Sequence, residues 1–477
     1  MKKVIRLSKI IAALGVVCLT GLPQESSGDA RKKAASFNKD VAPILFNKCA
    51  ECHRPGESAP MSLLSYKEAR PWARSIKEKV LARAMPPWHA DPNHGEFAND
   101  RRLTKQEIDT IVSWVDGGAR EGSPRDLPPA PSRSEQWNMG KPDAVLTVPE
   151  EVVLQAQGTD EYHYIEIPFP SQTDVYVQAA ELRPSNRKVA HHITAFIIPP
   201  PPGGMQMANM SKEMMEKIRA EMEKGSIFYY DGNLSRTKPD APVHDDGCSL
   251  PSGGSATSWD GSGKNWTSIA TPLIVYSPGV NPVTFPPGTA RKIPAGSKIF
   301  LQAHYFKPEG RVERDRPQLA LTFAKTPPDR EVHNELLINN YFKIPPGAER
   351  HEVTACWKVD KDIRLISFMP HMHWRGRSMR LEAALPDGRT KILLSVPDYN
   401  FSWQTTYYLK RPVPIPKGSR LKVVSYFDNS AKNRRNPDPA KAIRAGEPTA
   451  DEMMACFIDY TLDEGSPKDP VVEGRKK

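Results

Sequence analysis

The chain has 477 residues, which is enough for about three domains, and its 39% hydrophobic and 26% charged residues exclude bulk disorder. Its 47 prolines, about twice the usual share, exclude an all-helical bundle for most of the chain, because proline interrupts helices and suits strands joined by ordered loops. The net charge of +10 comes from dispersed Lys and Arg, so we expect no nucleic-acid partner.

The first thirty residues have the order of an export signal. A basic start is followed by an apolar stretch, Ile10 to Leu22, and then by small residues ending in Gly28-Asp29-Ala30. The stretch is too short to cross a bilayer, and Gly15-Val16-Val17 is a poor lipid-attachment sequence before Cys18. We therefore expect residues 1–30 to be a signal peptide, and the mature chain to be periplasmic or secreted with no membrane span.

Residues 31–121 contain the attachment pattern of a c-type haem. Cys49-Ala50-Glu51-Cys52-His53 is C-x-x-C-H, in which Cys49 and Cys52 bond the haem vinyl groups and His53 is the proximal iron ligand. Helical patterns cover residues 41–48 and 67–84, and a third helix begins at the capping box Thr104–Glu107 and ends at Gly117-Gly118. The segment resembles a class I cytochrome c, which implies one covalent haem c.

The second iron ligand is not decided by this pattern. We favour Met85, which follows the second helical stretch, because a Met–His pair raises the haem potential and suits an electron carrier. His89 is a rival ligand, and an open coordination position is the third alternative.

Beyond a proline-rich linker, residues 122–137, the sequence changes from helical to strand patterns. We predict two antiparallel, jelly-roll-like β-sandwich domains, residues 138–328 and 329–466, followed by a tail, residues 467–477. The fold class is therefore multidomain, a small all-α domain followed by two all-β domains. An insertion, residues 199–266, interrupts the first sandwich and carries an amphipathic helix over residues 211–224.

Five histidines stand inside the strand patterns: His191, His192, His304, His371 and His373. His371 and His373 share a face of a strand, whereas the neighbours His191 and His192 bind one ion together only at a bulge or strand end. No carboxylate accompanies these motifs, which favours a metal held by imidazoles. A thioether from Met453 or Met454 selects Cu(I).

Taken in order, these motifs resemble those of the copper type II, ascorbate-dependent monooxygenases. The residues that carry the resemblance are His191-His192-Ile193, Leu301-Gln302-Ala303-His304-Tyr305, His371-Met372-His373 and Asp451-Glu452-Met453. The resemblance implies two copper ions. His191, His192 and His304 would hold the electron-transfer copper. His371, His373 and Met453, with Met454 as the alternative thioether, would hold the copper that binds O2 for hydroxylation of an aliphatic C–H.

The sequence also departs from the peptide-hydroxylating members of that family. Met369, Ala455 and Phe457 stand where those enzymes have polar residues that hold a substrate carboxylate, so we expect a small, largely apolar substrate. The attached haem suggests electron delivery from a periplasmic donor. Two alternatives remain, a haem/copper electron-transfer or copper-binding protein without oxygenase activity, and a zinc-containing module.

Three cysteines lie outside the haem motif and the signal: Cys248, Cys356 and Cys456. We expect a Cys356–Cys456 disulfide, because both residues lie in the C-terminal third near the proposed metal ligands, and a lone thiol at Cys248.

Overall fold

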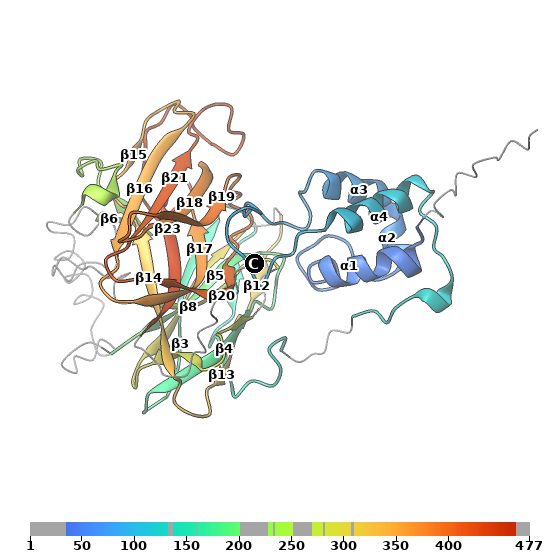
Figure 1. The fold of residues 1–477 in the computed structure, drawn as a ribbon, viewed down its shortest axis with the longest axis horizontal. Coiled ribbons are helices and arrows are strands. Elements are labelled where there is room, and N and C mark those ends of the chain that lie inside the picture. Colours follow the sequence, from blue (N-terminus) through green and yellow to red (C-terminus); the bar gives the residue numbers. More distant parts are fainter. Residues whose placement is uncertain are drawn as a thin grey trace, which may run out of the picture.

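The computed structural model describes residues 35–131, 137–158, 160–200, 228–231, 234–250, 270–279, 282–306 and 310–463. The predicted signal peptide, the insertion helix over 211–224 and the tail lie outside these residues. A small helical unit precedes a large β body, and the two lie beside each other (Figure 1). No helix among the described residues is long and apolar enough to cross a membrane.

The helical unit contains four α-helices packed around Phe37 and Trp114. It comprises a π-helical turn (Phe37–Val41), α1 (Ala42–Lys48), α2 (Tyr66–Ala69), a 3-10 turn (Arg70–Trp72), α3 (Ala73–Leu81), α4 (Lys105–Asp116) and a 3-10 turn (Pro124–Asp126). The predicted capping box of α4 is confirmed, since Thr104 and Glu107 bond each other's backbone N–H groups. The helix predicted over 67–84 is divided at Pro71, where the backbone tightens into the 3-10 turn.

Between α3 and α4 the chain leaves the helical unit and crosses to the β body (Figure 1). In this strap, residues 86–100, the Trp88 and Phe97 rings pack on Tyr407 with ring centroids 5.0 and 5.3 Å away. Phe97 also forms a β-bridge with Leu409. The helical unit is therefore attached to the β body by packed aromatic side chains as well as by the linker.

In the residues that the structure describes, the β body contains 23 strands arranged in several sheets. The strands of its first half are β1 (Ala144–Thr147), β2 (Val152–Leu154), β3 (Glu161–Ile167), β4 (Val175–Arg183), β5 (Ala190–Ile198), β6 (Phe228–Asp231), β7 (Leu234–Thr237), β8 (Thr271–Tyr276), β9 (Val283–Thr284), β10 (Thr289–Ile293), β11 (Lys298–Tyr305), β12 (Glu313–Asp315) and β13 (Gln318–Phe323). Those of its second half are β14 (Arg330–Ile338), β15 (Lys343–Ile344), β16 (His351–Lys358), β17 (Ile363–His371), β18 (Gly376–Ala384), β19 (Thr390–Val396), β20 (Tyr407–Ile415), β21 (Arg420–Phe427), β22 (Ile443–Arg444) and β23 (Ala455–Leu462).

One nine-stranded sheet runs through both halves, in the order β1-β13-β4-β10-β14-β23-β17-β20 with β9 beside β4. The parallel pairing of β10 with β14, through Thr289 opposite Arg330, joins the halves. A four-stranded sheet covers each half, β3-β11-β5-β8 in the first and β16-β21-β18-β19 in the second. The chain is therefore mostly β-sheet, as predicted. Its two halves share one sheet, and the β10–β14 pair is the join between them.

The predicted Cys356–Cys456 disulfide is wrong, because the bond joins Cys248 to Cys356. A 3-10 turn, Gly247–Ser249, lies on β16, where Asp246 bridges Thr354, and this brings the two Cα atoms to 4.9 Å. Cys456 lies in a different sheet, on β23, and is a buried free thiol.

Candidate metal centre

His191, His192 and His304 meet where β5 begins beside the end of β11. A regular strand would send the side chains of His191 and His192 to opposite faces. The pairing of β5 with β11 shifts register here, since His304 lies opposite His192 and Tyr305 opposite Ala190. This irregularity is the kind of bulge that the adjacent histidines require.

The three imidazoles of this three-histidine site (His191, His192 and His304) converge through their Nδ1 atoms. The Nδ1 atom of His191 lies 3.1 Å from that of His304 and 3.2 Å from that of His192. All three side chains are buried. Burial, with the neighbouring histidines as a smaller cause, lowers the pKa of His191 and His192 well below the usual value, so neutral ligand nitrogens are favoured.

His304 is oriented by two neighbours. Its Nε2 atom lies 3.2 Å from Asp160 Oδ2, so Nε2–H donates to the carboxylate and the Nδ1 lone pair faces the other histidines. The Tyr162 ring stacks on the imidazole with centroids 4.3 Å apart. An all-imidazole donor set of this kind fits copper and also fits zinc.

His371 and His373 lie across from this group. The strand β17 ends at His371 and His373 follows in the loop, so the two do not share a strand as predicted, but their ring centroids are only 5.2 Å apart. The Nδ1 atom of His371 donates to Gln404 Oε1 at 2.9 Å, and that of His373 lies 3.3 Å from the carbonyl oxygen of Asp451. Both contacts leave Nε2 as the nitrogen available to a metal ion. Burial lowers the pKa of His371 to about 4.

The two alternative thioethers lie in different surroundings. Met453 lines the cavity beside His371 and His373, whereas Met454 is fully buried in the hydrophobic core of the second half. Glu452, the residue before Met453, links this segment to the loop that contains His373, because its buried carboxylate accepts the backbone N–H groups of His373 at 2.9 Å and Arg375 at 2.6 Å. We call His371, His373 and Met453 the His371 site.

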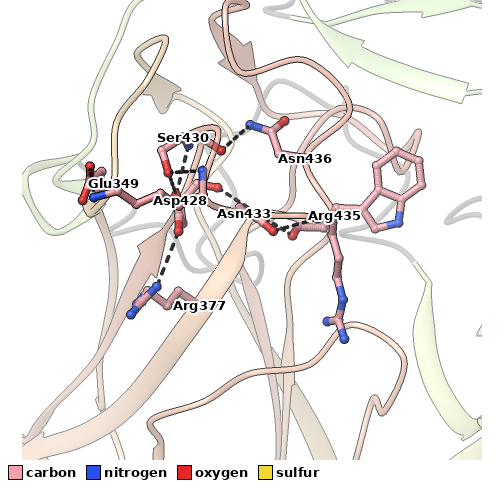
Figure 2. A network of polar contacts seen from close by, with 9 residues as sticks. Glu349, Arg377, Asp428, Ser430, Asn433, Arg435 and Asn436 are labelled. Atoms are coloured by element: carbon pink, nitrogen blue, oxygen red, sulfur yellow. Dashed lines mark hydrogen bonds and ion pairs between the residues drawn. The ribbon is translucent and has the colours of Figure 1, made fainter.

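A second loop supports the residue after His373. Figure 2 shows the network that shapes this loop, in which Ser430 Oγ donates to Asp428 at 2.7 Å. The Asn433 amide donates to the carbonyl oxygen of Asp428 at 2.9 Å and to that of Trp374 at 3.2 Å. The loop after β21 therefore holds the backbone next to the His371 site in one position.

Both sites border one cavity of about 120 Å³ at the join between the halves. His192 enters it from β5, and its ring centroid lies 6.2 Å from that of His371. Met369 and Phe457, two of the apolar departures found in the sequence, also line the cavity. Phe401 lies between the two sites, with its ring centroid 4.7 Å from that of His191 and 5.8 Å from that of His373.

In the helical unit, the C-x-x-C-H residues follow α1 directly. His53 Nδ1 lies 3.3 Å from the carbonyl oxygen of Met61, a contact that leaves Nε2 available to a haem iron. Cys52 lies against Gly279 of the β body. The two are so close that a Cβ atom added to Gly279 would lie 2.8 Å from the Sγ atom of Cys52. Arg101 Nη2 donates to the Gly279 carbonyl oxygen at 2.6 Å.

The two proposed distal ligands follow α3. Met85 is half-buried just before the strap. His89 lies within the strap, where burial lowers the pKa of its imidazole. The assignment of Met85 as the iron ligand stays a prediction.

The sequence analysis missed four residues that shape these sites: Tyr162, Gly279, Phe401 and Gln404. Tyr162 lies next to the His-containing strand β11 in the sheet, and only strand pairing could have located it. Phe401 and Gln404 belong to the irregular segment between β19 and β20, which has no periodic pattern. Gly279 follows Pro278, a turn signal that carries no information about what packs on the turn.

One family model matches part of the chain. Residues 335–469 match the model of the copper type II ascorbate-dependent monooxygenase, C-terminal domain. This match includes His371, His373 and Met453, and it supports a copper-dependent monooxygenase, which is an oxidoreductase. No curated protein matches the chain.

Two solved structures are similar over about two thirds of the chain. The major capsid protein P2 from bacteriophage PM2 is 9% identical, with 67% of this chain and 97% of that chain covered and a TM-score of 0.24. PNGF-II is 11% identical, with 68% of this chain and 65% of that chain covered and a TM-score of 0.25. These scores are too low to support an argument about fold or function.

Proposed function

We propose that the chain is an exported copper monooxygenase that hydroxylates an aliphatic C–H of a small, largely apolar substrate. The balanced reaction consumes the C–H compound, O2, two electrons and two protons, and it yields the alcohol and water. Copper bound at the two sites would supply the one-electron chemistry and the binding of O2, and a covalent haem c would supply the electrons. A periplasmic donor would reduce the haem.

The observation that carries this proposal is the pair of buried histidine groups on one cavity. The three-histidine site has three nitrogen donors and the His371 site has two nitrogens and one thioether, and no carboxylate of the described residues joins either donor group. Such neutral donors tolerate both copper oxidation states, as redox turnover requires. The match of residues 335–469 to the family model supports the same activity.

The packing of the helical unit supports haem as the electron source. Cys52 lies against Gly279, and Ser277, two residues earlier, donates its hydroxyl to the Gln404 carbonyl oxygen at 3.1 Å. Gln404 in turn contacts His371. The haem-attachment loop and the His371 site are thus joined through a short series of packed and hydrogen-bonded residues.

Export is supported by the Cys248–Cys356 disulfide, because such bonds persist in oxidising compartments such as the periplasm. The same compartment is where c-type haem would function in this proposal.

The first test is the copper and haem content of mature protein produced in a host that attaches c-type haem. We expect one haem and two coppers per chain, with one copper lost in His304→Ala and the other weakened in Met453→Ala. Oxygen uptake with a reductant, coupled to a hydroxylated product in a screen of small apolar compounds, would then establish the activity. Haem without copper, even after Cu(I) loading, would overturn the proposal.

The relay is tested separately. The double variant Cys49→Ala/Cys52→Ala should not hydroxylate the substrate when the electron donor reduces only haem. It should still hydroxylate the substrate when its copper is reduced directly. Two coppers that exchange electrons with the haem, without oxygen uptake for any substrate, would support the alternative electron-transfer protein.

A further inference from the structure

Gln404 is a buried polar side chain that the sequence motifs do not include. It lies in the irregular segment between β19 and β20, is 2% exposed and lines the cavity shared by the two sites. Its carbonyl oxygen Oε1 accepts the Nδ1–H of His371 at 2.9 Å. Its backbone oxygen accepts the buried hydroxyl of Ser277, which holds the segment in place.

The other end of the same amide has no partner. Gln404 Nε2 is buried and makes no hydrogen bond to any residue that the structure describes. A buried donor without an acceptor costs free energy, and native proteins keep such groups where a ligand or water completes them. Gln404 lines the cavity beside His371, so a molecule bound in the cavity is the candidate partner for this N–H.

The remaining lining residues restrict what can accept that hydrogen bond. No Lys or Arg is among those described around the cavity, so a carboxylate would enter without an opposite charge. The carboxylate of Glu447 is engaged by the Ser235 N–H at 2.6 Å. Leu336, Ile338 and Phe457 make part of the cavity lining apolar. A cavity of about 120 Å³ is of the order of one that holds a benzene-sized molecule, about 150 Å³.

We propose that Gln404 is a positioning and specificity-determining residue for a compact neutral substrate that carries a hydrogen-bond acceptor, such as a carbonyl or ether oxygen. Oε1 holds His371 in the tautomer that turns Nε2 toward the metal. Nε2 donates to the acceptor and so fixes the substrate beside His371. The first role rests on the proposed copper function, whereas the second is a property of the cavity alone.

The substrate role is tested by calorimetric titration with three ring compounds of similar shape: cyclopentanone, methylenecyclopentane and cyclopentanecarboxylate. The metal-free full chain should bind the ketone about five-fold more tightly than the hydrocarbon, because one net hydrogen bond is gained. It should bind the carboxylate more weakly than either. Gln404→Met, which keeps the length of the side chain without a donor, should abolish the preference for the ketone.

The positioning role is tested by the electron paramagnetic resonance spectrum of Cu(II) bound at the His371 site. Gln404→Glu keeps an oxygen for His371 Nδ1 and should retain the wild-type spectrum at pH 8, while losing the ketone preference. Gln404→Met should alter the spectrum. Gln318→Met, the same substitution on β13 remote from the cavity, is the control and should change neither readout.

Equal binding of ketone and hydrocarbon by the wild-type chain, or an unchanged preference in Gln404→Met, would overturn the substrate role. An unchanged Cu(II) spectrum in Gln404→Met would overturn the positioning role. If both results are as expected but oxygen uptake is never coupled to a product, the monooxygenase proposal fails while the assignment of Gln404 stands.

Discussion

His192 and His371 face each other with ring centroids 6.2 Å apart, although they belong to different halves of the chain and to different sheets. β5 carries His192 in the four-stranded sheet of the first half, and β17 carries His371 in the shared nine-stranded sheet. The two histidine groups are therefore opposite walls of one site, and a change in the packing between them acts on both.

Phe401 is the residue on which this coupling is most directly tested. Its ring contacts His191 and His373, so Phe401→Leu should weaken copper binding at both sites several-fold by loosening both imidazoles. The metal-free protein should lose about 1–2 kcal/mol of stability in urea unfolding. Copper titration against a competing chelator measures the binding effect.

Phe342→Leu is the matched control, because Phe342 is fully buried in the core of the second half and stacks on Phe427 rather than on a histidine. It should lower stability comparably and leave both copper affinities unchanged. An effect of Phe401→Leu at only one site would contradict the bridging role.

Gly279→Val should separate the haem-attachment loop from the β body. The new Cβ would lie 2.8 Å from Cys52 Sγ, a distance that requires the loop to move. We expect faster proteolysis of the strap and of the segment around Cys52, together with a larger radius of gyration in solution scattering.

Gly388→Val separates this steric effect from backbone strain. Gly388 has a φ of +84°, close to the +76° of Gly279, but no described atom lies within 4 Å of its Cβ position. In both variants the free energy of unfolding should fall by about 1 kcal/mol, because valine disfavours the left-handed backbone conformation. Equal proteolysis of the two would show that the contact with Cys52 contributes nothing to docking.

Loss of the Cys248–Cys356 disulfide should destabilise the second half. The bond closes a segment of 108 residues, and Cys248→Ser should lower the free energy of unfolding by about 2–4 kcal/mol. Cys456→Ser should leave the disulfide intact. Peptide mapping without reductant distinguishes the two pairings, and recovery of a Cys356–Cys456 peptide would refute the assignment.

Glu447 predicts a pH dependence of stability. Burial raises the pKa of this carboxyl from 4.5 to about 7. Between these values the folded chain keeps a proton that the unfolded chain has released. The contribution of Glu447 to the free energy of unfolding is therefore fully present below pH 4.5 and is lost as the pH rises to 7. Glu447→Gln should raise the free energy of unfolding at pH 8 by about 1–3 kcal/mol relative to wild type, with no gain at pH 4.5. Thermal unfolding across this range measures the difference, and equal profiles would contradict it.

Much of the local structure followed from the sequence. The capping box of α4, the strands that carry His191 and His304, and the predominance of β-sheet depend on neighbouring residues, whose spacing is visible in the chain. The proposed metal ligands could be identified because each group stands in a short motif. The disulfide was predicted wrongly because pairing of cysteines depends on where distant turns lie, and nothing near Cys248 in sequence indicates that its turn rests on β16.

The sequence by itself determined which residues can bind metal and which segments form strands, since ligand chemistry and side-chain alternation are local properties. Only the tertiary structure decided that the two histidine groups share one cavity. It also placed Phe401 between these groups, Gln404 beside His371, and Cys52 against Gly279. These contacts join residues far apart in the chain, and they arise because β10 pairs with β14 and the strap packs on Tyr407. Burial of apolar surface stabilises that arrangement as a whole, and no single motif encodes it.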